Sequence, residues 1–154
     1  MQATIQDTVR TLIIPLQQRN LLVPNVVVAE IVPYVRPRAV EEAPEWLLGT
    51  ISWRGLTIPI LSFDRLYGDA EVSLAQARIA VLNTATKTSG LPFYAIVTAG
   101  IPQLKRVSES MLQAQPGAAE KGELGRVEIG TLSTVIPDLE ALENTVAQIW
   151  NKVA

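Results

Sequence analysis

Apolar and polar residues alternate most clearly between Gly49 and Gly68, where two short apolar runs flank Arg54 and Gly55. A period of two is typical of β-strands with two distinct faces. The Arg-Gly pair is therefore predicted to form the turn of a hairpin, because glycine tolerates positive φ angles. Pro59 has no N–H to donate to a sheet, so the second run is predicted to be an edge strand or to lie beside a bulge.

Further strands are predicted on both sides of this hairpin. The apolar runs Thr11 to Leu16 and Leu21 to Val23 are separated by polar residues, which indicates a first hairpin. The β-branched run from Val26 to Ile31 favours extended structure. Downstream, Arg78 to Ala85 and Leu91 to Val97 are predicted to form a further hairpin.

Two short helical turns are predicted beside the central hairpin. In the segment from Val40 to Leu48, Pro44 suits the start of a single turn, and Gly49 would end it. The segment from Phe63 to Tyr67 is predicted to be a short helix, because Gly68 follows at the position where glycine commonly ends a helix.

The last third of the chain is predicted to contain a loop, a strand and a helix. Small and polar residues predominate between Lys105 and Gly125, which predicts a long mobile loop. A last strand is predicted from Val127 to Leu132, with Val135 and Ile136 continuing it. Beyond Pro137, apolar residues recur at steps of three and four, which predicts a helix packed on the strands; these residues are Leu139, Leu142, Val146, Ile149, Trp150 and Val153.

Length and hydropathy set the scale of the fold. A chain of 154 residues has room for one domain or for two small subdomains that share a core. The hydrophobic fraction is 48% and the mean hydropathy is +0.24, yet no stretch approaches the roughly 18 apolar residues of a membrane span. The apolar excess therefore either fills barrel interiors or forms a partner-binding surface. The amino-terminal sequence MQATIQDTVR does not resemble a secretion signal, so a cytoplasmic location is expected.

Charge and residue chemistry remove several classes of function. With 13 basic and 15 acidic residues and no basic cluster interleaved with aromatic residues, nucleic-acid binding is not expected. The chain has no histidine and no cysteine, so the usual general base, zinc ligands and Ser-His or Cys nucleophiles are missing. No phosphate-binding glycine motif occurs either, and neither a cofactor nor a metal is expected. The adjacent Glu41 and Glu42, with Glu45 nearby, are the remaining candidate for acid/base catalysis, and a solvated loop is the favoured interpretation.

The central block reads GTISWRGLTIPILSFDRLYG and resembles the core motif of the CheW-like coupling proteins of bacterial chemotaxis. That motif consists of a glycine, an apolar run, Arg-Gly, an apolar run with proline, and a short helix ending in glycine. The resemblance extends from about Leu12 to Leu142. It implies an all-β fold of two intertwined, SH3-like, five-stranded barrels with a C-terminal helix. Residues 1–154 would then form a single CheW-like domain made of two small barrel subdomains.

The sequence departs from the family pattern at three positions. Ser62 and Thr98 stand where the family usually carries acidic residues, and Trp53 is bulkier than the residue that usually precedes the arginine. The contacts of the second half are therefore less transferable than those of the first half. Flagellar chemotaxis, twitching or pilus-linked motility and other chemosensory arrays all use such couplers, and the departures favour an accessory or alternative coupler.

The resemblance implies a non-catalytic adaptor. It would couple the cytoplasmic tip of a methyl-accepting chemoreceptor to the regulatory domain of a CheA-type histidine kinase. Its location would be the cytoplasm, at membrane-associated chemosensory arrays, without insertion into the membrane. A different class of function, a β-barrel that binds a small ligand, would need an interior cavity with convergent polar groups, whereas the inward positions here are Val, Ile and Leu.

Candidate binding residues follow from the resemblance. Arg54 and Glu30 stand at positions whose side chains are expected to lie near each other between the two barrels, at the receptor-binding groove. Val28 and Ile31 are apolar residues next to Glu30, and they either line that groove or belong to the core.

The kinase-binding rim is expected on the second strand of the central hairpin. Its residues are Gly55, Leu56, Ile58 and Pro59, and the rim is chosen because the proline marks an open edge. As with the groove, Ile58 either contributes to this surface or belongs to the core.

Overall fold

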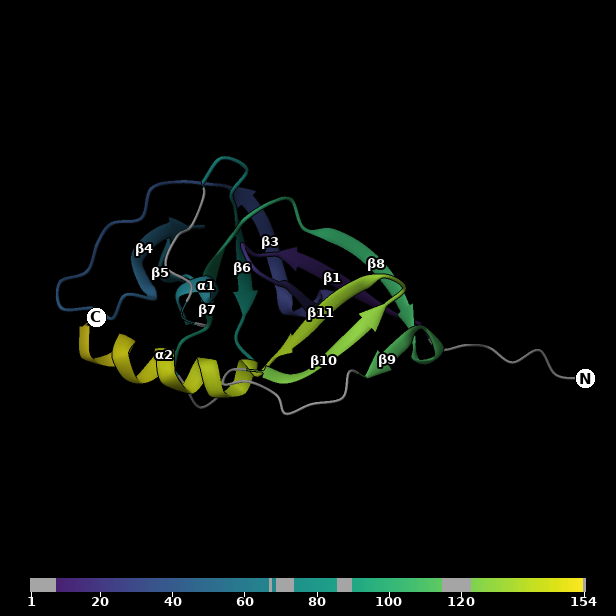
Figure 1. The fold of residues 1–154 in the computed structure, drawn as a ribbon. Helices are drawn as coiled ribbons and strands as arrows, with labels where there is room; N and C mark the ends of the chain where they lie inside the picture. The colour runs from purple at the N-terminus through teal and green to yellow at the C-terminus, as the bar shows by residue number, and fades with distance from the viewer. Residues whose placement is uncertain (1–7, 67, 69–73, 86–89, 115–122, 154) are drawn as a thin grey trace, which may run out of the picture.

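The structure is a computed structural model that describes residues 8–66, 68, 74–85, 90–114 and 123–153 (Figure 1). The first sheet has six strands, in the spatial order β8 (Gln103–Ser108), β1 (Thr8–Pro15), β2 (Asn20–Pro24), β11 (Leu132–Pro137), β10 (Glu123–Ile129) and β9 (Leu112–Ala114). The second sheet has five strands, in the order β3 (Val28–Pro33), β6 (Arg78–Asn83), β7 (Phe93–Thr98), β5 (Leu56–Leu61) and β4 (Leu47–Trp53). The helical segments are η1 (Asn25–Val27), α1 (Phe63–Leu66), η2 (Glu109–Met111) and α2 (Leu139–Val153).

The chain begins in the first sheet, passes to the second at β3 and returns to the first at β8 (Figure 1). The two halves are therefore intertwined, as predicted. Antiparallel hairpins make up most of each sheet, and each sheet also contains one short parallel contact. In the first sheet this contact pairs Val135 with Leu21, and in the second it pairs Ile60 and Leu61 of β5 with β7.

Three apolar clusters form the core. One lies within the second sheet and contains Ile58, Ile60, Ile79, Val81 and Val97 among others. A smaller one lies within the first sheet and comprises Ile13, Leu22, Val107 and Ile129. The largest joins residues of both sheets to the C-terminal helix. Alternate residues of one strand enter different clusters, so strands such as β6 are apolar on both faces and absorb much of the apolar excess.

The C-terminal helix α2 confirms the predicted amphipathic pattern. Its residues Leu142 and Val146 are buried in the shared cluster, and Leu139, Ile149 and Trp150 pack partly against it. The side chain of Val153 lies outside the described part of the structure. Asp138 caps the helix, because its Oδ1 accepts a 3.1 Å hydrogen bond from the Ala141 N–H.

A buried carboxylate also ties α2 to the second sheet. Glu143 is fully buried, and its two carboxylate oxygens accept 2.9 Å hydrogen bonds from the Tyr94 hydroxyl and the Ala85 N–H. Burial raises the pKa of the Tyr94 phenol, and the negative charge and hydrogen bond of Glu143 raise it further. The helix is therefore held by a polar contact as well as by its apolar stripe.

The region predicted as a long loop is largely β-structure. β8 continues to Ser108, η2 and β9 follow, and β10 begins at Glu123; residues 115–122 of the predicted loop lie outside the described residues. β8 and β9 are the edge strands of their sheet, and edge strands commonly carry polar residues that hide the strand pattern. The predicted last strand is likewise a hairpin, with β10 and β11 joined at Gly130, which has a φ of 62°.

The predicted helical turn at Pro44 is a single turn followed by a strand. The Leu47 N–H donates to the Pro44 carbonyl at 3.0 Å, and β4 starts at Leu47. Gly49 lies inside β4 at a register shift, with a φ of 144°. A Cβ at this position would lie 2.1 Å from the Arg38 carbonyl oxygen, so glycine is required by close backbone approach and not by a helix end. The second predicted helix is confirmed as α1, with Gly68 after it at a φ of 91°; Tyr67 lies outside the described residues.

Of the two alternatives predicted for Pro59, the edge strand is wrong, because β5 lies between β4 and β7. The bulge is confirmed, because the register of β4 against β5 shifts between Leu47 and Gly49, next to the pair of Thr50 and Pro59. Thr50, which faces Pro59 across the hairpin, directs its N–H and C=O to Arg38 on the outer side of β4. Thr50 and Pro59 are thus a non-hydrogen-bonded pair of the antiparallel ladder. Because no N–H is needed from the residue opposite Thr50, proline at this position removes no hydrogen bond between β4 and β5. Pairing with β7 begins only at Ile60, so Pro59 interrupts neither ladder.

Candidate functional site

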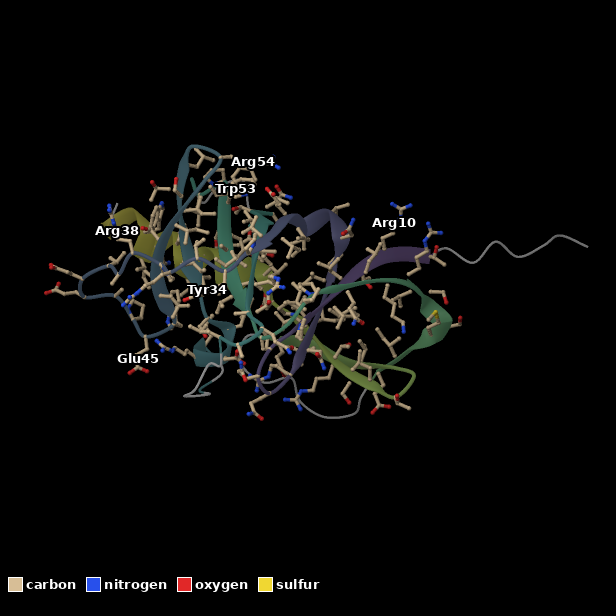
Figure 2. All side chains as sticks on the ribbon, turned by 90° about the horizontal axis from the view of Figure 1, so that it is seen from above. Arg10, Tyr34, Arg38, Glu45, Trp53 and Arg54 are labelled. Carbon is tan, nitrogen blue, oxygen red and sulfur yellow. The ribbon has the colours of Figure 1, made fainter. Side chains whose placement is uncertain are left out.

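The turn between β4 and β5 consists of Arg54 and Gly55, as predicted. Their φ angles are 48° and 78°, and two positive φ values are required by the type I′ turn that suits two-residue hairpins. For Gly55 this conformation is easily adopted, whereas for an arginine it is uncommon. The turn fixes the direction of the Arg54 side chain, which lies beside the adjacent indole (Figure 2).

Glu30 reaches this turn because of a bulge in β3. Val28 pairs with Leu82 but Glu30 pairs with Val81, so one extra residue, Ala29, is inserted in β3. The bulge moves Glu30 to the face that it shares with Val81, which belongs to the apolar cluster of the second sheet. The carboxylate therefore lies at the rim of that cluster.

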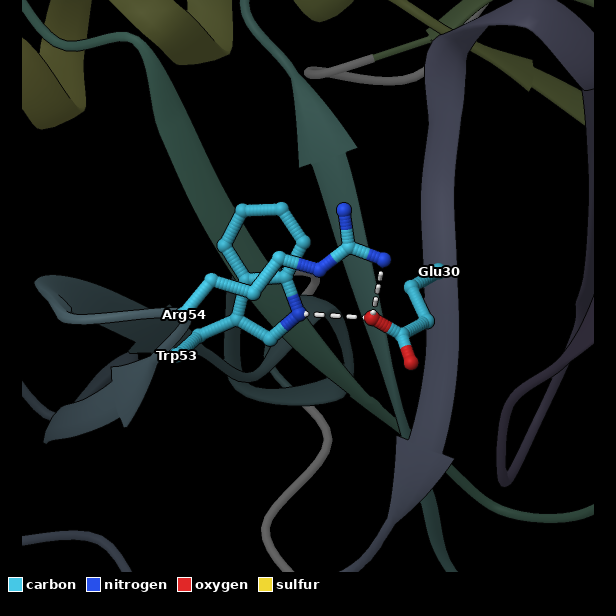
Figure 3. Close-up of polar contacts among 3 residues, drawn as sticks. All are labelled: Glu30, Trp53 and Arg54. Atoms are coloured by element: carbon cyan, nitrogen blue, oxygen red, sulfur yellow. Dashed lines mark hydrogen bonds and ion pairs between the residues drawn. The ribbon is translucent and has the colours of Figure 1, made fainter.

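One oxygen of Glu30 accepts two contacts (Figure 3). The Arg54 Nη2 lies 3.1 Å from Glu30 Oε1, and the Trp53 Nε1–H donates a 3.0 Å hydrogen bond to the same atom. The guanidinium carbon of Arg54 also lies 4.9 Å from the centroid of the Trp53 ring, within the range of a cation–π contact. The Arg54 and Glu30 side chains are 68% and 39% exposed, so their ion pair is worth only about 0.2–1 kcal/mol.

Trp53 anchors the site. Its ring is buried in the cluster of the second sheet and lies 4.8 Å from the Phe93 ring at an interplanar angle of 60°. A buried indole usually finds an acceptor for its N–H, which Glu30 supplies here. Sequence reasoning noted Trp53 only as a bulky departure from the family pattern. The available signal was a large aromatic residue that alternates with Ser52 directly before the predicted turn.

β3 and β4 are the two edge strands of the second sheet. The contacts of Glu30 with Trp53 and Arg54 therefore close this sheet on itself through side chains. The predicted proximity of Arg54 and Glu30 is confirmed, and both residues belong to the second sheet. The expected position of the pair at the groove between the two barrels stays a prediction.

The other predicted receptor-binding residues face elsewhere. Val28 and Ile31 are partly buried and pack against the shared cluster, on the face of β3 opposite Glu30. The bulge at Ala29 separates Val28 from Glu30, and it has no clear signature in the sequence, whereas Ile31 lies on the opposite face by ordinary alternation.

The four residues of the predicted kinase rim differ in exposure. Leu56 is 40% exposed and Gly55 is exposed, whereas Ile58 is 2% exposed and Pro59 is buried. Ile58 belongs to the cluster within the second sheet, so it lies in the core and does not contribute to the surface. The accessible residues of the predicted rim are therefore Gly55 and Leu56.

Ser62 and Thr98, the neutral residues at positions where the family usually carries acidic ones, both make local hydrogen bonds. Ser62 is buried, and its Oγ accepts a 3.2 Å hydrogen bond from the Arg65 N–H, so it caps α1. Thr98 is also buried; its Oγ1 accepts from the Arg78 N–H at 3.2 Å and donates to the Gly100 carbonyl at 2.6 Å. Neither side chain is available to a partner.

The alternatives of catalysis, metal binding and small-ligand binding find no assembled site among the described residues. Glu41, Glu42 and Glu45 are exposed, and the described residues contain no group of three or more acidic, histidine or cysteine side chains that could hold a metal. Among the described residues, apolar side chains form the cluster within the second sheet, whereas a ligand-binding barrel needs convergent polar groups. No described helix combines the length and apolarity needed to cross a bilayer.

The comparisons with known proteins agree with the fold. The family model described as "CheW-like domain" matches residues 10–146. The crystal structure of the scaffolding protein TtCheW from Thermoanaerobacter tengcongensis is similar, with a TM-score of 0.73 and 17% identity, over 86% of this chain and 90% of that chain. No curated protein matches the sequence. The predicted class of paired SH3-like barrels with a C-terminal helix is thus confirmed, with the short β9 as an additional strand, and the chain belongs to the CheW-like domain family.

Proposed function

We propose that this chain is a chemosensory adaptor that holds the cytoplasmic tip of a chemoreceptor and the regulatory domain of a CheA-type histidine kinase together. Its place would be the cytoplasmic side of membrane-associated chemosensory arrays. The observation that carries the proposal is the family match over residues 10–146, which includes the whole of the central hairpin. CheW-like scaffold proteins are non-catalytic, so the chain would act by binding two partners at once.

The receptor contact is assigned to the exposed part of the Glu30 and Arg54 pair. The positive φ of Arg54 and the bond from Trp53 to Glu30 hold both side chains in fixed directions, which lowers the entropy lost on binding. The second oxygen of Glu30 and the remaining guanidinium donors of Arg54 are then the groups offered to a receptor helix. Val28 and Ile31 would take part only at the margin of the contact, because they are partly buried on the other face of β3.

The kinase contact is assigned to Leu56 and Gly55, with Ile58 and Pro59 as the buried support beneath them. Leu56 is a large apolar side chain that is 40% exposed directly after a rigid two-residue turn. Such a side chain can enter an apolar pocket of a partner without rearrangement of the hairpin.

The decisive experiment is reconstitution. The receptor and kinase that co-purify with the chain from its native cells, identified by mass spectrometry, are mixed with increasing amounts of the purified chain, and autophosphorylation of the kinase is measured. Kinase activity should change until the chain is stoichiometric with its partners, and an excess should reverse the effect by placing the two partners on different copies.

A kinase activity that ignores the chain at every ratio would contradict the adaptor function. Turnover of any substrate by the purified chain, abolished by Glu41→Gln or Glu42→Gln, would instead restore the enzyme hypothesis.

A further inference from the structure

An open depression of about 400 Å³ lies on the outer side of the hairpin formed by β4 and β5. Arg36 and Arg38 line it on one side, and Thr50, Ser52 and Thr57 line it on the other. The side chains of Thr50 and Ser52 alternate along β4 with those of Ile51 and Trp53, which are buried in the second sheet. The depression is therefore on the opposite face of β4 from the Glu30 and Trp53 contact.

The backbone at this depression has an unfilled pairing position. Arg38 and Thr50 exchange both backbone hydrogen bonds, at 2.9 and 2.8 Å, as an isolated antiparallel bridge. Ser52 lies two residues further along the strand, so its N–H and C=O point to the same outer side. In the same register Ser52 would face Arg36, but within the described chain the bridge between Arg38 and Thr50 is isolated and does not continue there.

The polar side chains around this position are two guanidinium groups and three hydroxyl groups, and the apolar Val35 and Ile51 complete the lining. Arg36 and Arg38 are exposed, and among the described residues neither guanidinium forms an ion pair. Thr57 pairs with Ser52 across the hairpin, so their hydroxyl groups lie on the same face as that of Thr50. Among the described residues, no acidic side chain lines the depression. Two arginines and three hydroxyls without a carboxylate favour an oxyanion, and arginine binds carboxylates with two parallel hydrogen bonds.

We propose that this depression binds an extended acidic segment of a partner protein by strand addition to β4. One residue of the segment would pair with the backbone of Ser52, and flanking carboxylates would contact Arg36 and Arg38. A free strand edge favours a peptide over a small anion, because the edge offers a peptide both a backbone donor and a backbone acceptor. This surface is separate from the two assigned to receptor and kinase, and its existence does not depend on that proposed function.

The test uses the full chain and a short synthetic peptide in which Glu alternates with Val. A second peptide, with Gln in place of every Glu, is the uncharged control. Affinity is measured by fluorescence anisotropy at low and high salt, and the contact is mapped by backbone amide NMR. The acidic peptide should bind about tenfold more weakly to the double variant Arg36→Gln/Arg38→Gln than to the unaltered chain. High salt should weaken the binding of the acidic peptide to the unaltered chain. Arg10→Gln changes an exposed arginine of the first sheet and should leave binding unchanged.

In the NMR titration the Ser52 amide should shift and become protected from exchange on addition of the acidic peptide. Equal binding of the Glu and Gln peptides, or equal binding to the chain with both arginines replaced, would overturn the proposal. Inorganic phosphate provides the last arm of the test. If phosphate shifts the resonances around Arg36 and Arg38 but the acidic peptide does not bind, the depression is a simple anion site and strand addition is wrong.

Discussion

Glu30 and Trp53 join the two edge strands of the second sheet through a 3.0 Å hydrogen bond from the indole Nε1–H to the carboxylate Oε1. In a closed barrel β3 and β4 would be joined by backbone hydrogen bonds, whereas here a side-chain hydrogen bond joins them. Arg54 adds an ion pair to the same oxygen from the exposed side. The Glu30 and Arg54 pair that the family resemblance implies is thus part of a three-residue arrangement, in which the buried Trp53 positions Glu30 and Glu30 positions Arg54.

Trp53→Phe tests this arrangement. Phenylalanine keeps an aromatic ring against Phe93 but has no N–H, so Glu30 loses its buried donor. The free energy of unfolding in urea should fall by about 1–3 kcal/mol, from the lost hydrogen bond and the smaller ring. Glu30→Gln is the matched control, because its amide oxygen still accepts from the indole; it should cost clearly less. Equal losses for the two variants would show that the charge on Glu30, and not the indole bond, closes the sheet.

Substitutions at Arg54 separate backbone strain from side-chain contacts. Both Arg54→Ala and Arg54→Gly remove the exposed ion pair, worth about 0.2–1 kcal/mol, but only glycine adopts a φ of 48° without cost. Arg54→Gly should therefore be more stable than Arg54→Ala by about 1 kcal/mol in urea unfolding. Receptor binding, measured by titration with the receptor fragment, should weaken in both variants. If Arg54→Ala lost much stability and kept full binding, the receptor assignment would be wrong.

How much of this site the sequence could reveal depends on how local each feature is. The turn at Arg54 and Gly55 was predictable, because alternation and a glycine at positive φ are local signals. The bulge at Ala29 was not, since a register shift depends on the partner strand β6, and it decides which side chains share the face of Glu30. For the same reason Val28 could not be sorted from Glu30 by strand alternation alone, whereas alternation does place Ile31, the next residue, on the opposite face.

The burial of polar residues in the core could not be predicted from local sequence patterns either. Glu143 lies near the start of the C-terminal helix, where an acidic residue suits the helix dipole and is commonly exposed, yet its side chain is fully buried. Its partners are Tyr94 and Ala85, which are far from it along the chain. The edge strands β8 and β9 were mistaken for a loop because they lack the continuous apolar character of the central strands.

The buried tyrosine predicts a loss of stability at alkaline pH. An unfolded tyrosine has a pKa of about 10, and the pKa of Tyr94 is raised above this value in the folded chain. Above that pH the unfolded chain releases a proton that the folded chain retains. The free energy of unfolding is therefore unaffected by this group below pH 10 and falls above it, by up to about 1.4 kcal/mol per pH unit.

Urea unfolding between pH 8 and 11 measures this slope, in the unaltered chain and in Tyr94→Phe. The variant lacks the titrating hydroxyl, so its stability should be lower near pH 8, because Glu143 loses a donor, but should decline less steeply above pH 10. Parallel curves for the two proteins would mean that other groups cause the alkaline loss.

Leu56 and Ile58 form a matched pair for the kinase rim. Leu56→Asp places a charge on an exposed position, so the chain should keep its circular-dichroism spectrum and lose co-precipitation of the kinase. Ile58→Asp places the same charge in the core of the second sheet and should unfold that half of the chain. Undiminished kinase binding by the folded Leu56→Asp variant would show that the rim lies elsewhere.

The charge swap between Glu30 and Arg54 gives the sharpest test, because Trp53 shares the Glu30 oxygen. With Glu30→Arg and Arg54→Glu combined, an opposite-charge pair is restored, but the indole N–H faces a group that cannot accept its hydrogen bond. In a double-mutant cycle of receptor affinity, the swap should therefore recover only part of the binding lost by either single change. The same cycle with Trp53→Phe throughout removes the unsatisfied donor, so recovery should be larger in that background. If recovery were equal in the two backgrounds, the indole bond would have no part in orienting the pair for its partner.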